Sequence, residues 1–542
     1  MNRKSDPYIL AKFDVSGIQS YIFASNRLQE NVGASCQVTR ILEEFLPDSI
    51  KEEIIFPQDY VLDWEKEDRL CILEKENLKA EIVYIGGGNA VVLFRGRQEF
   101  EKVSQSLGRK VAENCQGIYL VSAYVEKTEL QNFKSDMEEL GRNLAGIKAD
   151  MIRQPVYSPF PVVEQDNMDH QPITRCYKYK KDGSGDKFES YVIKNMTEMR
   201  YQKWKTYQWS RHNKDKKMYP MLDKINNYDY PVEMEQLCSK NCENSYIAVV
   251  HIDGNGMGRQ IQEVLNTETE YAVAVSVLRQ KSKEITGIFK NAYRAVLLKL
   301  ENHTKLLSRD DEERTIFPLR PVILDGDDFT FLCAADLAIP IAAGFLNELS
   351  NCQKEENKKI TACAGIAFVH SHFPFSEAYH IAEETCSRAK KKWYKERKEK
   401  NNCQDSSFLD FCVLKGSEVG GVQKHEEWQM RPYCVTVQNK RVRNDALVYL
   451  YDTIKAMEDK WPSNRLHRIY GAMLEGDEQM KLLQKEFLSR KYNIEELIQT
   501  DDWRNSSLYD ALELRGLCRT ELLEDLLNIQ EKQVNEKMEF KD

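Results

Sequence analysis

The sequence lacks the segments that would place a protein in a membrane or send it out of the cell. No apolar run among its 542 residues approaches the roughly 20 residues that a membrane-spanning helix needs. The N-terminus passes from a short polar segment straight into an expected strand, without the apolar core of a signal peptide. These absences exclude a membrane-spanning protein and predict a cytoplasmic location with no membrane partner.

Other familiar signatures are also missing. The 14 cysteines have no regular spacing, and several lie inside apolar runs, so we expect buried reduced thiols rather than a disulfide framework. A formal net charge of −9 argues against a surface that binds nucleic acid throughout. Neither a Walker loop nor a Ser-His or Cys-His constellation stands out. Candidate chemistry therefore has to be found in local motifs.

A carboxylate-rich turn is the most informative motif. Residues 321–332 (PVILDGDDFTFL) comprise two β-forming runs joined by a turn that carries Asp325, Asp327 and Asp328. Asp-Gly between such runs is a common hairpin signal, so one interpretation is a solvated turn without function. A second apolar run, residues 246–252, ends at Asp253 and a glycine-rich turn. If the two strands are neighbours, four carboxylates share one sheet edge.

Such crowding is costly unless a cation neutralises it. Two unit negative charges ~4 Å apart repel by about 4 kcal/mol at an effective dielectric near 20. Carboxylates gathered in this way usually hold a divalent cation, and hard oxygen ligands suit Mg²⁺ or Mn²⁺, which share phosphate oxygens with a substrate. We therefore predict a metal and nucleotide site with Asp253, Asp327 and Asp328 as ligands.

The order of strand-Asp, helix, Gly-Asp-Asp hairpin, helix and strand resembles the palm of GGDEF-type cyclases and CRISPR polymerases. The turn Asp-Gly-Asp-Asp at 325–328 is similar to their GGDD motif. The likeness continues through residues 360–368 (ITACAGIAF) and 382–390 (AEETCSRAK). One departure is Asp325, which replaces the first glycine and puts a side chain where backbone would approach a phosphate.

The first 150 residues show the same motif without its carboxylates. An expected strand at 8–15, a hairpin at 81–94, a helix at about 98–114 and a strand at 118–125 give a βαββαβ order. The hairpin tip is Gly-Gly-Gly-Asn where the second copy has Asp-Gly-Asp-Asp. Its glycines could expose backbone N–H groups to a phosphate or a base, and a tight turn accounts for them equally well.

We accordingly predict an α+β protein with two ferredoxin-like palms and four domains. Residues 1–150 form the first palm, which lacks the carboxylates, and residues 151–243 form a linker or insert domain. Residues 244–415 form the second palm with the DGDD turn, and residues 416–542 form a helical C-terminal domain. Basic and aromatic residues interleave at 200–212, where they either pack the linker domain or bind single-stranded nucleic acid.

The linker also holds one possible half of a zinc site. Cys238 and Cys242 form a single CxxxC pair, with Cys176, His170 and His212 upstream. A zinc ion needs four ligands, and a second pair is not evident. Zinc in this domain is therefore left open.

The resemblance implies the large polymerase subunit of type III CRISPR systems, a pyrophosphate-releasing nucleotidyltransferase. Such an enzyme joins NTPs, here ATP, into cyclic or linear oligonucleotide signals for antiviral defence. Asp327 and Asp328 would then be catalytic, and Lys390 would neutralise the triphosphate, although a solvated helix end also explains this lysine. The nucleotide-binding residues predicted with it are Gly87, Gly88, Gly254, Asn255 and Gly326.

The resemblance also sets expectations about partners and missing parts. RNA and other effector subunits are implied partners, and self-association is left open. The N-terminal His-Asp nuclease domain common in such subunits is not expected, since the sequence starts at the first palm and has no histidine before His170. The alternative function is an RNA-binding palm scaffold of an RNA-guided complex with little or no catalysis.

Overall fold

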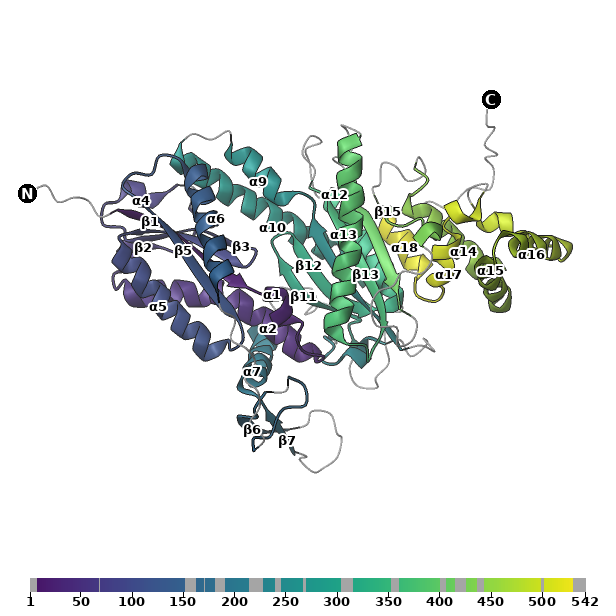
Figure 1. Cartoon of the computed structure of the whole chain (residues 1–542), viewed down its shortest axis with the longest axis horizontal. Coiled ribbons are helices and arrows are strands. Elements are labelled where there is room, and N and C mark those ends of the chain that lie inside the picture. Colours follow the sequence, from purple (N-terminus) through teal and green to yellow (C-terminus); the bar gives the residue numbers. More distant parts are fainter. Residues whose placement is uncertain are drawn as a thin grey trace, which may run out of the picture.

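The computed structural model shows an elongated molecule with two α+β units, a small projecting insert and a C-terminal group of helices (Figure 1). No helix in the described part of the chain is both long and apolar enough to cross a membrane. The ranges that the structure describes are 7–67, 69–151, 162–169, 171–180, 191–213, 228–238, 245–266, 270–303, 315–351, 360–399, 406–414, 426–435, 443–498 and 502–529.

The N-terminal unit is built on a five-stranded sheet in the order β2-β3-β4-β1-β5. Its strands are β1 (Tyr8–Ser16), β2 (Tyr60–Val61), β3 (Ala80–Gly86), β4 (Asn89–Arg95) and β5 (Tyr119–Lys127). Its helices are α1 (Ile18–Ile22), α2 (Leu28–Arg40), α3 (Leu46–Glu53), α4 (Cys71–Glu74), α5 (Arg97–Asn114) and α6 (Phe133–Asp150). Strand β1 pairs antiparallel with both β4 and β5, which gives the strand order of a ferredoxin-like βαββαβ unit.

The central unit repeats this plan on a six-stranded sheet in the order β11-β12-β9-β13-β14-β15. Its strands are β9 (Tyr246–Gly254), β11 (Leu319–Asp325), β12 (Asp328–Ala334), β13 (Ala362–His370), β14 (Phe408–Val413) and β15 (Tyr433–Cys434). Its helices are α9 (Met257–Leu265), α10 (Tyr271–Glu301), α12 (Ala338–Asn351) and α13 (Phe375–Glu399). The predicted α+β class is confirmed.

The insert and the C-terminal helices flank these units. The insert contains a β6–β7 hairpin, the helix α7 and β8, which pairs with β10; their bounds are β6 (Arg175–Lys180), β7 (Tyr191–Met196), α7 (Glu198–Asn213), β8 (Tyr228–Asp229) and β10 (Thr315–Ile316). The C-terminal helices are α14 (Leu447–Lys460), α15 (Ser463–Glu475), α16 (Asp477–Ser489), α17 (Leu508–Glu513) and α18 (Thr520–Leu527).

The two α+β units pack against each other through aromatic side chains. Phe23, after α1, stacks on Tyr379 of α13 with ring centroids 3.9 Å apart and meets the edge of Phe375 at 5.4 Å. On the other side of the interface, Phe133 of α6 lies edge-on to Tyr271 of α10 at 5.1 Å. These buried contacts fix the sheets of the two units relative to each other, and the hairpins with them.

Helix α13 lies so close to β13 that only glycine fits at Gly365. A Cβ there would stand 2.1 Å from the carbonyl oxygen of Ala382 and 2.2 Å from the backbone nitrogen of Cys386. We expect Gly365→Ala to destabilise the fold by about 3 kcal/mol through overpacking, measured as a lower urea midpoint. Gly287→Ala is the control, because nothing lies within 4 Å of its Cβ and alanine favours the α10 helix. Equal stability of the two variants would contradict this packing.

Candidate active site

Strand β9 brings its aspartate next to the acidic hairpin. Asp253 pairs across the sheet with Asp328, the first residue of β12, and Asp328 pairs with Asp325 at the end of β11. Gly254 allows the hairpin to close on β9, since a Cβ there would lie 2.8 Å from the Cβ of Asp327 and 3.0 Å from its Oδ2. Asp253 therefore meets the three aspartates of the 325–328 turn, which is distant from it in the sequence, at one sheet edge.

Lys390 is the cation that faces these carboxylates. It projects from α13, and its Nζ lies 2.5 Å from Oδ2 of Asp253 and 3.0 Å from the carbonyl oxygen of Gly254. Burial alone would lower the pKa of Lys390, but the charge and hydrogen bond of Asp253 outweigh burial and raise it. The lysine is therefore charged at neutral pH and offsets one of the carboxylates.

Burial and mutual repulsion act on the remaining carboxylates. Burial, reinforced by the charge of Asp253, raises the pKa of Asp327 to about 6. The same two causes raise the pKa of Asp328 well above its ordinary value. Such shifts are typical of sites where a charge is held for a function rather than for stability.

A buried histidine supports Asp328 from the same sheet face. Nδ1 of His251 lies 3.0 Å from the Thr330 hydroxyl and 3.5 Å from Oδ1 of Asp328, and burial lowers the pKa of His251 to about 4. The imidazole is thus neutral at physiological pH. It limits the orientation of Asp328 without adding a charge.

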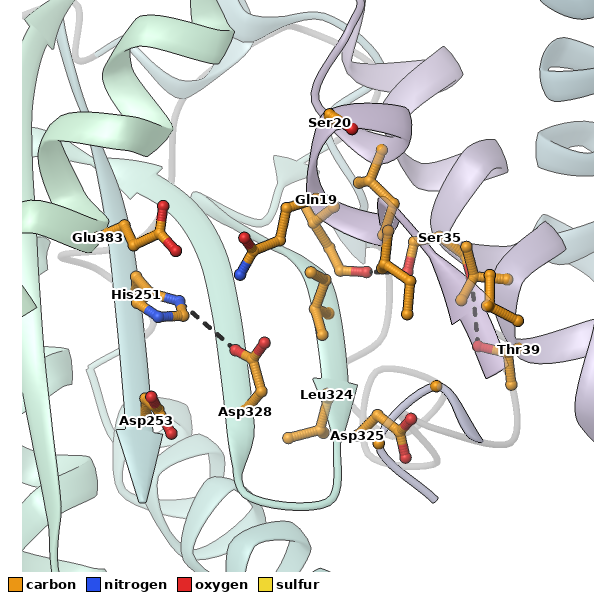
Figure 2. Close-up of a pocket in the computed structure, with 18 of the residues that line it drawn as sticks. Gln19, Ser20, Ser35, Thr39, His251, Asp253, Leu324, Asp325, Asp328 and Glu383 are labelled. Carbon is orange, nitrogen blue, oxygen red and sulfur yellow. Dashed lines mark hydrogen bonds and ion pairs between the residues drawn. The ribbon is translucent and has the colours of Figure 1, made fainter. Parts of the chain in front are cut away.

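These groups open into a cavity of about 700 Å³ between the two α+β units. In Figure 2, Asp253 and Asp328 lie on adjacent strands, and Gln19 and Ser20 of α1 line the facing wall. Six of the residues predicted from the sequence line this cavity: Gly87, Gly88, Asp253, Asp327, Asp328 and Lys390. The cavity thus draws on both copies of the motif.

The comparisons with known proteins bear on the central unit. Residues 246–402 match the family model described as Cas10/Cmr2, second palm domain. This segment is therefore similar to a Cas10/Cmr2 second palm. No curated protein sequence gives a significant match to the chain.

Solved structures similar to the chain include three of Csm1-Csm4 cassettes. The apo cassette gives 13% identity and a TM-score of 0.45 over 94% of this chain and 70% of that one. The cassette in complex with cA4 gives 14% identity and a TM-score of 0.44, and the match covers 94% of this chain and 70% of that one. The cassette in complex with AMPPNP gives 14% identity and a TM-score of 0.42, and the match covers 72% of this chain and 54% of that one. This chain therefore spans only 54% to 70% of the length of these matched chains, and the family match covers residues 246–402.

Three of the predicted nucleotide-binding residues of the central unit do not line the cavity. The side chain of Asn255 is buried and donates to the Thr361 hydroxyl at 3.0 Å, so it fastens the loop after β9 to the protein instead of lining the cavity. Gly254 has no side chain, which lets Asp327 pack closely against it, and its carbonyl oxygen accepts a hydrogen bond from Lys390. Gly326 takes a positive φ of 58° at the hairpin tip and does not line the cavity.

The donor set of the palm fits the chemistry of Mg²⁺ or Mn²⁺, because it offers several carboxylate oxygens, the hard ligands that these ions prefer. Their arrangement is not that of a finished metal site. Among the residues that the structure describes, no group of three or more His, Cys, Asp or Glu side chains is arranged to hold a metal ion. One of the carboxylates, Asp253, is instead paired with Lys390 of α13.

The basic and aromatic run at 200–212 lies in a helix of the insert and makes packing contacts with the N-terminal unit. It forms most of α7, in which Arg200 is buried between Glu30 of α2 and Asp166, and Lys203 donates to the carbonyl oxygen of Tyr21 at 2.8 Å. This helix packs the insert against the N-terminal unit. His170 and Cys242, two of the considered zinc ligands, lie outside the described residues.

The raised pKa of Asp327 predicts a pH dependence of stability. An acid whose pKa is higher in the folded protein stabilises the fold when protonated, and this contribution is lost as the pH rises from about 4 through about 6. In a chelating buffer, Asp327→Asn should therefore melt above wild type at pH 7.5, and the gap should shrink toward pH 5. A gap that does not change between these pH values would contradict the raised pKa of the half-buried Asp327.

Proposed function

We propose that the chain is a metal-dependent nucleotidyltransferase that makes cyclic or linear oligonucleotide signals from NTPs, with ATP as substrate, in type III CRISPR defence. The observation that carries the proposal is the meeting of Asp253, Asp327, Asp328 and Lys390 in one cavity with the glycine tip of the other unit. A family match to the Cas10/Cmr2 second palm supports it.

In this proposal the residues of the central unit have different roles in binding the nucleotide and in catalysis. Lys390 neutralises the phosphate tail of the nucleotide and leaves Asp253 when it does so. Asp328, oriented by His251 and Thr330, accepts the proton of the attacking 3′-hydroxyl. Phosphorus exchanges its bond to pyrophosphate for a bond to that 3′-oxygen, and pyrophosphate leaves.

The carboxylates Asp253, Asp327 and Asp328 would hold the Mg²⁺ or Mn²⁺. A bound dication supplies charge stabilisation for the transferring phosphate and offsets the repulsion among the carboxylates. On the other wall, Gly87 and Gly88 line the cavity with backbone that can approach a nucleotide closely. Other effector subunits and RNA are the partners that this function implies.

The direct test is product formation by the whole chain. Purified protein with Mg²⁺ or Mn²⁺ and each radiolabelled NTP, with and without RNA, should release pyrophosphate and form oligonucleotides that mass analysis identifies. Metal removal by EDTA should stop the reaction. Retention of RNA without consumption of any NTP would reject the enzyme and favour the RNA-binding scaffold.

A further inference from the structure

The N-terminal unit contains a second Lys–Asp pair in the same cavity. Nζ of Lys148 lies 2.5 Å from Oδ2 of Asp14, as Nζ of Lys390 lies 2.5 Å from Oδ2 of Asp253. All four residues line the cavity. The two pairs therefore belong to one space.

The two aspartates occupy the same position in the two sheets. Asp14 pairs across β1 and β4 with Asn89, the first residue of β4. Asp253 pairs across β9 and β12 with Asp328, the first residue of β12. Each strand thus delivers its carboxylate to the base of the neighbouring hairpin tip.

The two lysines are equivalent as well. Lys148 lies fifteen residues after Phe133, which begins α6, and Lys390 lies fifteen residues after Phe375, which begins α13. Each of these phenylalanines packs on an aromatic ring of the other unit. The units are therefore related by an approximate twofold arrangement that sets one Lys–Asp pair on each side of the cavity.

What differs between the two sides is the local charge. Gly88 and Asn89 replace Asp327 and Asp328, and the Asn89 amide is held within its own hairpin by the Tyr84 hydroxyl at 2.8 Å. The N-terminal side thus has one carboxylate, Asp14, and two cations close to it, Lys148 and Lys12. A phosphate group can approach Lys148 without the repulsion that four aspartates create on the other side.

We propose that Lys148 binds the phosphate tail of a second nucleoside triphosphate directly, and that Asp14 holds the ammonium in position until the phosphate takes its place. This inference rests on the proposed function, because an enzyme that joins two NTPs has to hold both of them in the cavity. The side chain of Lys148 is 35% exposed and that of Asp14 is 15% exposed, so the lysine can be reached by a ligand while the carboxylate stays in place.

The test is equilibrium binding of α,β-methylene-ATP, a non-reacting analogue, to the whole chain by calorimetry with Mg²⁺. Wild type should bind two molecules per chain, and Lys148→Met should lose affinity at one site by at least about tenfold, the effect of a charged hydrogen bond. Lys148→Arg should retain it. Lys127→Met is the matched control, because Lys127 pairs with Asp136 and Glu139 in the same unit without lining the cavity.

The outcomes separate this inference from the proposed function. Two sites of wild-type affinity in Lys148→Met would overturn it, even if product forms. Loss of one site in Lys148→Met would support it, even if no NTP is consumed and the proposed function fails. A wild type that binds no analogue would overturn it too. Should Lys148→Met not fold, Asp14→Asn decides, because the freed lysine should bind at least as tightly as in wild type, and loss of the site would overturn the role of Lys148.

Discussion

The double substitution Asp327→Asn and Asp328→Asn is expected to reduce product formation by about 1000-fold or more while raising the melting temperature of the metal-free protein. Catalysis falls because asparagine neither neutralises a dication nor accepts a proton, and such electrostatic contributions are worth several kcal/mol of barrier. Stability rises because burial and the neighbouring charge raise the pKa of both carboxyls, so that ionising them at neutral pH costs folding free energy.

The two readouts are measured on the same preparation, by pyrophosphate release and by thermal unfolding in EDTA. Asp325→Gly is the matched control in the same turn, since it removes a carboxylate and restores the glycine of the related motif. It should keep product formation within about tenfold of wild type. A double variant that melts below wild type and still forms product would refute both the site and its electrostatics.

The sequence was sufficient to predict the acidic edge because the chemistry is local. Two apolar strands, one ending at Asp253 and one at the 325–328 turn, predict adjacent carboxylates from charge and pattern alone. In the structure Asp253 and Asp328 are indeed paired across neighbouring strands. Asn255 was different, because its side chain turns toward Thr361, and no local pattern records that direction. The ion pair of Lys390 with Asp253 likewise depends on how α13 packs on β13.

Asp14 and Lys148 were missed for another reason. At the hairpin tips Gly88 and Asn89 replace aspartates, so the sequence pattern shows the first copy without the carboxylates that mark the second. The register of β1 and the position of Lys148 along α6 would have revealed the pair. A duplicated motif is best compared strand by strand, since equivalent positions persist where residue types change.

Contacts between the two copies follow the same duplicated plan. The strand β3 has a register irregularity between Ile82 and Tyr84, and β11 has one between Pro321 and Ile323. A side chain of the other unit binds the carbonyl at each of them: the Ser35 hydroxyl donates to Val322, and Nε of Arg279 donates to Val83. The two hairpins that carry the site are therefore held by reciprocal hydrogen bonds across the interface.

Arg279 makes the stronger of these two contacts. Its guanidinium pairs with Glu81 at 2.9 Å, and both side chains are almost fully buried, at 1% and 0% exposure. The same guanidinium also donates to backbone carbonyls of the N-terminal unit, including Ile82 at 2.8 Å. The Glu81 carboxylate in turn accepts from the backbone N–H of Ile72 at 2.6 Å. Removal of the arginine would leave a buried charge and several carbonyls without their donor.

We therefore expect Arg279→Met to destabilise the protein by about 3 to 5 kcal/mol, measured by urea unfolding. Arg279→Met combined with Glu81→Gln should be more stable than the sum of the single changes predicts, because it removes the unpaired charge. Arg259→Met is the control, since its pair with Glu263 is exposed on α9 and should change stability by no more than about 0.5 kcal/mol. If Arg279→Met cost no more than this control, the buried pair would not be what holds the β3–β4 hairpin at the cavity.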